Sequence, residues 1–132
     1  MLVPSYADTE QAGSATEAID LPAYLARIGY TGRLEPTADV LHALVRCHMA
    51  SIPFEAIDVM LGYGVDLDPA VIDRKMLDQR RGGYCFEHAS LLRRALHAIG
   101  FVLEQHLARV WISDRIDGPA PAATHASLKV EA

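Results

Sequence analysis

The chain has 132 residues, of which 51% are hydrophobic, so it is long enough to bury the core of one modest domain. Its formal net charge of −5 argues against a nucleic-acid partner or an anionic membrane surface. No apolar run approaches the length of a membrane span, and two cysteines, Cys47 and Cys85, are too few for a disulfide framework. We therefore expect a reduced, cytoplasmic protein that binds neither nucleic acid nor membrane.

The N-terminal third of the chain predicts a loose leader and two helices. Residues 1–19 are polar and small, without the basic start and apolar block of a secretory signal, and we interpret them as a loose leader. A short helix is expected in 20–30, because Asp20 can cap it and a proline lies in its first turn. Thr37 can cap a second helix, which keeps apolar residues at helical spacing through about Ala50.

Glycine and proline divide the middle of the chain into further helical segments. Residues 54–62 predict a short helical turn closed by a glycine. Asp68, followed by a proline, opens another helix, which we expect to run to about Gln79. The strongest helical pattern runs from Cys85 to Ile99 and stops at Gly100.

The character of the sequence changes after Gly100. Residues 101–112 are rich in β-forming side chains, a loop with two prolines follows, and 124–132 predict a second short strand. Two strands joined by a loop are marginal in water, and the last strand would offer an unpaired edge. We therefore predict an α+β fold, with helices at 20–100 before the opening of an antiparallel sheet, and a homo-oligomer formed through the exposed strand edge.

The segment 80–92, RRGGYCFEHASLL, places Cys85 at the expected start of a helix. A helix N-terminus presents unpaired N–H groups and a partial positive charge, which favour a thiolate over a thiol. Two glycines leave room for a substrate carbonyl, while Arg80 and Arg81 add positive charge. Local chemistry leaves two interpretations of Cys85 open, a nucleophile or a buried small hydrophobe. Cys47 lies in an amphipathic helical pattern and is interpreted as a core residue.

A nucleophilic cysteine needs a base within hydrogen-bond reach. His125 follows the proline loop at the entry to a strand, a common place for a catalytic side chain held on a scaffold. His88 is three residues past Cys85, so we expect it beside the first turn of the helix rather than at the sulfur. The remaining histidines are His106, whose mid-strand position is ambiguous, and His42, His48 and His97, whose helical positions favour surface or core packing.

Four segments, in this order, resemble the arylamine N-acetyltransferases. The stretch at 80–101 resembles the active-cysteine segment of that family, whose hallmark is Arg-Gly-Gly-x-Cys-x-Glu. The stretch at 21–62 is similar to the family's N-terminal helical region, and ARVW and THASLKV resemble its first barrel strands. The likeness is collinear over about residues 19–131. It implies an N-terminal helical bundle followed by the first strands of an antiparallel β-barrel, truncated at 101–132, with a papain-like arrangement of cysteine and histidine.

The resemblance also implies a reaction. Cys85 would take an acetyl group from acetyl-CoA, with His125 as its proton partner, and pass it to an arylamine or arylhydrazine nitrogen in two steps. The family's third triad member is an aspartate that follows the strand bearing the histidine, beyond Ala132, so activity of the 132-residue chain alone is left open. Asp114 and Asp117, in the loop before the histidine, are interpreted as solvated.

The resemblance assigns supporting roles to five residues. Phe54, in IPFEA, corresponds to a residue of the family's Ile-Pro-Phe-Glu-Asn stretch, which lines the acceptor pocket, although Ala56 takes the place of the asparagine that ends it. Arg27 and Glu55 match an ion pair that ties the first helix to the Pro-Phe-Glu turn. Arg81 and Glu87 flank the nucleophile, and we interpret both as salt-bridging residues that brace the turn.

Metal binding gains no support from the sequence, because neither Cys-x-x-Cys nor His-Glu-x-x-His is present. Two alternatives to acetyl transfer stay open. A papain-like hydrolase or amide synthase would use the same cysteine and histidine. A truncated, inactive relative would serve instead as a binding or oligomerising module.

Overall fold

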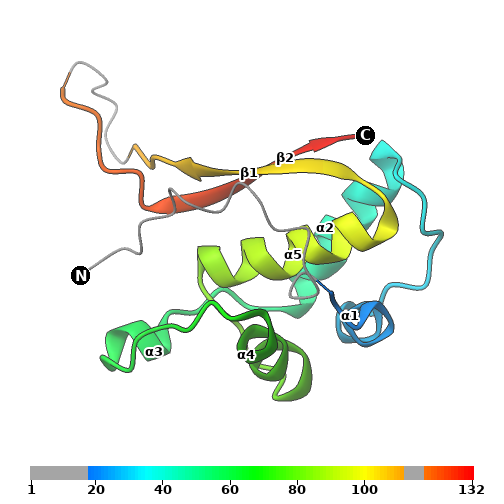
Figure 1. The fold of residues 1–132 in the computed structure, drawn as a ribbon, viewed down its shortest axis with the longest axis horizontal. Coiled ribbons are helices and arrows are strands. Elements are labelled where there is room, and N and C mark those ends of the chain that lie inside the picture. Colours follow the sequence, from blue (N-terminus) through cyan, green and yellow to red (C-terminus); the bar gives the residue numbers. More distant parts are fainter. Residues whose placement is uncertain (1–17, 112–117) are drawn as a thin grey trace.

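The computed structural model describes residues 18–111 and 118–132 (Figure 1). In chain order, its elements are α1 (Leu21–Ile28), α2 (Ala38–Ser51), α3 (Ile57–Met60), α4 (Pro69–Asp73), the π-helical η2 (Arg74–Asp78), α5 (Cys85–Ile99), β1 (Val102–Ala108) and β2 (His125–Glu131). The predicted order of helices before an antiparallel sheet is confirmed.

Local sequence signals set the helix boundaries. The side chains of Asp20 and Asp68 cap α1 and α4, each accepting a hydrogen bond from a backbone N–H of the first turn, at 3.0 and 2.9 Å. At the other ends, α1 and α5 stop at Gly29 and Gly100, whose φ values of 68° and 109° lie in the left-handed region. These boundaries lie within a residue or two of the predicted ones.

The segment predicted as one helix from Asp68 to about Gln79 is divided in the structure. After α4 the chain widens into the π-helix η2, and Arg80 then adopts a left-handed φ of 54°. The turn that follows is tied back, because the N–H of Arg81 donates to the carbonyl of Lys75 at 3.0 Å. The widened turn matters for the site, since it places Lys75 beneath the N-terminus of α5.

One apolar core joins the helices to the sheet. Its buried members are Tyr24, Ile28, Val40, Leu44, Ile52, Ile72, Met76, Leu77, Leu91, Ala95, Leu96 and Phe101. Leu103 of β1 and Val130 of β2 pack against this cluster. In Figure 1 the sheet runs along one side of α5, while α1, α3 and α4 lie on the other side. The division into domains at 20–100 and 101–132 stays a prediction.

The sheet of the described residues has two strands, which run antiparallel. Val102 lies opposite Glu131 and Ala108 opposite His125, so the first residue of β2 pairs with the last residue of β1. β1 is shorter than the strand expected at 101–112, because it ends at Ala108. The register therefore fixes where His125 stands at one end of the sheet.

The boundary of the predicted leader is corrected by two contacts. The guanidinium of Arg94 donates to the carbonyl of Ala18 at 3.3 Å, and Ile19 packs against the core. Both residues fall in the predicted loose leader but belong to the folded part of the chain. The rest of that leader, 1–17, lies outside the described residues.

Candidate active site

Backbone contacts hold the turn before α5 against the segment that follows α2. The N–H of Gly83 donates to the Pro53 carbonyl at 3.3 Å, and a second bond, accepted by the Gly83 carbonyl at 2.9 Å, completes a parallel bridge with Phe54. A Cβ at Gly82 would overlap the Pro53 carbonyl oxygen, and one at Gly83 would lie 2.8 Å from a carboxylate oxygen of Glu87. The glycines thus permit this close packing, whereas the sequence suggested that they make room for a substrate.

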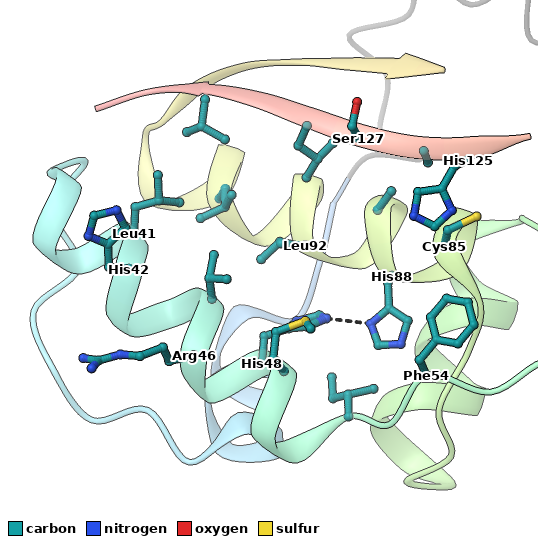
Figure 2. Close-up of a pocket in the computed structure, with 18 of the residues that line it drawn as sticks. Leu41, His42, Arg46, His48, Phe54, Cys85, His88, Leu92, His125 and Ser127 are labelled. Carbon is teal, nitrogen blue, oxygen red and sulfur yellow. Dashed lines mark hydrogen bonds between the residues drawn. The ribbon is translucent and has the colours of Figure 1, made fainter. Parts of the chain in front are cut away.

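Cys85 and His125 come from distant segments and meet at one pocket. Cys85 is the first residue of α5 and is half-buried, and its Sγ lies 3.9 Å from the carbonyl oxygen of Thr124. His125, the next residue, begins β2. Figure 2 shows the thiol and the imidazole facing the same cavity, which both side chains line. The structure therefore brings together the two residues that the sequence analysis paired.

The pocket is a groove of about 1200 Å³ between α2, α5 and β2. Its walls are mainly apolar and include Leu41, Val45, Ile52, Leu92, Leu96 and Leu128. Cys85, His125 and Phe54 stand at one end, and His42 and Arg46 of α2 stand at the other (Figure 2). Such a cavity suits a largely apolar ligand whose reactive group is held at the sulfur.

Phe54 and His88 form the side of the pocket below the thiol. The Phe54 ring is 65% exposed and stacks on the imidazole of His88, with ring centroids 6.2 Å apart and planes 9° apart. His88 projects from α5 one turn beyond Cys85, as the helical spacing predicted. It faces Phe54 and α2 rather than the sulfur (Figure 2).

Behind this wall, three titratable side chains form one hydrogen-bonded chain. His88 Nε2 lies 3.2 Å from the Pro53 carbonyl, His48 Nε2 lies 2.8 Å from His88 Nδ1, and the Tyr24 hydroxyl lies 2.9 Å from His48 Nδ1. A carbonyl only accepts, so His88 carries its proton on Nε2. A neutral His88 must then accept at Nδ1, so His48 donates from Nε2 and Tyr24 donates its hydroxyl hydrogen.

Burial keeps both imidazoles of this chain neutral. It lowers the pKa of His48 to about 4, and the repulsion that a protonated His48 would meet from a protonated His88 and from Arg27 acts in the same direction. Burial also lowers the pKa of His88, against the opposing effect of its bond to the Pro53 carbonyl. At neutral pH the chain therefore consists of uncharged, mutually satisfied groups.

A group of charged side chains supports the turn from below. Lys75 Nζ lies 2.8 Å from Glu87, 2.9 Å from Asp58 and 3.6 Å from Glu55. Glu87 is only 2% exposed, and its second oxygen accepts the N–H of Tyr84 at 2.9 Å, directly before Cys85. The carboxylate thus caps the N-terminus of α5, next to the residue that carries the thiol.

The two arginines assigned to this region make different contacts. Arg81 pairs with Asp58 at 2.9 Å and Glu55 at 3.2 Å. Arg27 donates instead to three backbone carbonyls, those of Ser51, Met76 and Arg80, at 2.6, 2.8 and 3.2 Å. The expected ion pair of Arg27 with Glu55 is therefore wrong. The three carbonyls satisfy the buried guanidinium of Arg27. The carboxylate of Glu55 pairs instead with Arg81 and Lys75.

Neither the role of Lys75 nor the partnership of Tyr24 with His48 was predicted from the sequence. Their spacing in the chain carries no signal, because the contacts depend on how distant helices pack. Asp114 and Asp117 lie outside the described residues. Within the described ranges, His, Cys, Asp and Glu side chains form no group of three or more that could hold a metal ion, and helices there are too short or too polar to cross a membrane.

The arrangement is typical of cysteine-dependent acyl transfer, because a thiol at a helix N-terminus faces an imidazole across a mainly apolar cavity. Residues 37–132 match the sequence model of a family described as N-acetyltransferase. The arylamine N-acetyltransferase of Mycolicibacterium smegmatis is 46% identical over 114 residues, which cover 86% of this chain and 42% of that protein. The corresponding Mycobacterium tuberculosis protein is 45% identical, with 86% and 40% covered.

Solved structures agree with these matches. The arylamine N-acetyltransferase of M. tuberculosis superposes with a TM-score of 0.79 at 44% identity, over 85% of this chain and 42% of that one. The Mycobacterium marinum protein in complex with CoA gives a TM-score of 0.77 at 42% identity, over 85% and 41%. The chain belongs to the arylamine N-acetyltransferase family, which confirms the resemblance seen in the sequence. It spans about two-fifths of the length of these relatives.

Proposed function

We propose that Cys85 is the nucleophile of an acetyltransferase, which moves acetyl from acetyl-CoA to an arylamine or arylhydrazine nitrogen. The observation that carries the proposal is the Cys85 thiol at the N-terminus of α5, facing the same pocket as the ring of His125 (Figure 2). Family membership supports the choice of acyl group, and a relative has been solved in complex with CoA.

In the first half-reaction, the Cys85 sulfur bonds to the acetyl carbon and the carbon–sulfur bond of acetyl-CoA breaks. His125 takes the thiol proton and gives it to the departing CoA thiolate. In the second, the amine nitrogen attacks the Cys85 thioester, and its proton passes through His125 to the sulfur. Backbone N–H groups at the start of α5 stabilise the oxyanion of each tetrahedral intermediate.

The acceptor would lie against Phe54. Its exposed ring forms one side of the pocket next to the thiol, and an apolar wall suits a flat aromatic amine. The charged residues Arg81, Glu87 and Lys75 would brace the turn that carries the sulfur. Both cysteines of the chain are free thiols, which agrees with the reducing, cytoplasmic setting that we propose.

Further elements of the proposal concern the rest of the fold. We infer that β1 and β2 are the first strands of a β-barrel domain, and that the cysteine and histidine adopt a papain-like arrangement. Similarity to solved family members supports both inferences. A homo-oligomer paired through the strand edge also stays a prediction, supported by the two-stranded sheet of the described residues.

The test is to incubate the protein with acetyl-CoA and locate the acetyl group by peptide mass spectrometry. We expect the label on Cys85, and we expect Cys85→Ser to lose it. Cys47→Ser is the matched control, because Cys47 lies in α2 and does not line the pocket, and it should label normally. Labelling of Cys47 alone, or undiminished acetyl transfer by Cys85→Ser, would refute the proposed nucleophile.

A further inference from the structure

In the acetyl transfer proposed above, no proton or acyl group passes through the hydrogen-bonded chain of Tyr24, His48 and His88. Tyr24 is fully buried and His48 is 2% exposed, so both polar groups have left water entirely. A buried polar group is costly unless it is bonded, and in this chain each bond depends on the next one along. An apolar filling of the same space would avoid that dependence, which suggests that the chain serves the pocket it adjoins.

The end of the chain contacts two parts of the site. His88 donates to the Pro53 carbonyl, which also accepts the N–H of Gly83 in the turn before the thiol. The same imidazole lies nearly parallel to the ring of Phe54, 6.2 Å away. Phe54 is 65% exposed, so the described residues hold its ring chiefly from this one side (Figure 2).

Proton transfer from the thiol is a poor role for His88. Its Nε2 is bonded to the Pro53 carbonyl and its Nδ1 to His48, so both nitrogens are already occupied. His125 faces the thiol without such constraints from α2 (Figure 2). The contacts of His88 are those of a residue that holds its neighbours in place.

We propose that Tyr24, His48 and His88 are positioning residues for the acceptor amine. The chain fixes the His88 ring, and through it the Pro53 carbonyl and the Phe54 ring, in the geometry that receives an aromatic amine. It sets the affinity for the acceptor and leaves the attack of Cys85 on acetyl-CoA unaffected. The inference rests on the proposed function and names the residues that tune its second half-reaction.

The first test measures binding of 4-chloroaniline, as a plain arylamine probe, and separately the rate at which acetyl-CoA acetylates Cys85 in the absence of amine. Tyr24→Phe removes only the hydroxyl that donates to His48. We expect it to weaken 4-chloroaniline binding about tenfold, and to change the acetylation rate by less than about twofold. A merely structural role would slow acetylation in parallel.

Two controls separate the chain from its surroundings. His97→Gln alters an exposed histidine of α5 that does not line the pocket, and should change neither quantity. His48→Gln keeps a donor near the position of Nε2 and should bind the probe more tightly than His48→Leu, which keeps none. Equal binding of 4-chloroaniline by the wild type and folded Tyr24→Phe would overturn the proposal, as would no binding by the wild type.

Nitrogen NMR of the histidine rings tests the geometry without any activity. We expect both His48 and His88 to hold the Nε2–H tautomer at neutral pH, and the His48 Nδ1 resonance to shift in Tyr24→Phe. Tautomers averaged as in free imidazole would overturn the chain itself. If the wild type binds the probe and shows fixed tautomers but Cys85 is never acetylated, the proposed function fails and the positioning geometry stands.

Discussion

Lys75 contacts three carboxylates beneath the turn that precedes α5. Burial by itself would lower the pKa of Lys75, but its bonds to Glu87 and Asp58 outweigh that effect and raise the pKa above its ordinary value. Glu87 has little contact with water and caps α5 beside Cys85. Lys75 therefore supplies the positive charge that faces the buried carboxylate of Glu87.

Replacing Lys75 with methionine should destabilise the protein strongly. The substitution leaves the Glu87 carboxylate buried without its cation, a type of loss that costs about 3–5 kcal/mol. Lys129→Met is the matched control, because Lys129 is 66% exposed and only 4.0 Å from a carboxylate on the surface, and it should cost less than about 1 kcal/mol. Urea unfolding measures both.

A second variant checks the reason for that loss. Adding Glu87→Gln to Lys75→Met removes the uncompensated charge and should recover part of the lost stability. If the double variant is less stable than Lys75→Met by the full cost of Glu87→Gln alone, the two residues are not coupled. Lys75 would then not be the group that compensates the buried charge of Glu87.

At the residue scale, the sequence predicted positions better than partners. Cys85 at a helix start and His88 one turn beyond it follow from local spacing, and both are confirmed. The predicted ion pair of Arg27 with Glu55 was wrong, because the guanidinium donates instead to three backbone carbonyls of other segments. Whether His125 acts as the proton partner stays a prediction, although the structure places it at the pocket.

Among the elements, the turn before α5 depends on a backbone approach that only glycine allows. Gly82 lies against the Pro53 carbonyl, and this contact aligns the segment after α2 with the turn that carries Cys85. A side chain there would push the two segments apart. The Phe54 side of the pocket would then move away from the Cys85 thiol.

Gly82→Ala should therefore cost about 1–3 kcal/mol of unfolding free energy, because overpacking forces the backbone to shift. Gly118→Ala is the matched control, since a Cβ there meets no atom of the described residues within 4 Å, and it should be neutral or slightly stabilising. Thermal unfolding of the two variants against the wild type measures the difference. Equal melting temperatures for both variants would contradict the contact.

Helix starts and stops could be predicted because they depend on neighbouring residues. Asp20 and Asp68 cap the helices that they were expected to cap, and Gly100 ends α5. The π-helix η2 could not be predicted, since the widening is stabilised by distant partners such as Arg27, which bonds the Met76 carbonyl. Local propensity alone favours an ordinary α-helix there.

For the whole molecule, the buried imidazoles make stability depend on pH. The pKa of His48 falls from 6.5 to about 4 on folding, so between these values the unfolded chain binds a proton that the folded chain does not. Stability should thus be complete above pH 6.5 and fall as the pH drops toward 4, by roughly 3 kcal/mol from His48. The lowered pKa of His88 acts in the same direction.

Chemical unfolding at a series of pH values between 7 and 4 measures this effect. His48→Gln removes the titrating group and should flatten the curve in that window, even though the variant is less stable at pH 7. Carboxylates titrate in both proteins, so the difference between the two curves isolates His48. Parallel curves would show that His48 does not titrate differently on folding.

The sequence predicted the order of the whole fold, helices before an antiparallel sheet, because each segment's composition and periodicity are local properties. The pocket could not be predicted. It requires β2 to pair with β1 in a register that sets His125 at one end, and α2 to lie across from it. Neither relation is encoded in the spacing of residues within one segment.

The three carbonyls bound by Arg27 belong to the end of α2, to η2 and to the turn that leads into α5. Detaching any one of these segments would leave part of the buried Arg27 guanidinium without a hydrogen-bond acceptor, so none can fray by itself. The region should therefore open as one cooperative unit, with matching hydrogen-exchange protection in α1, α2 and η2. Opening of this unit would therefore remove the support of the Cys85 thiol all at once, not by degrees.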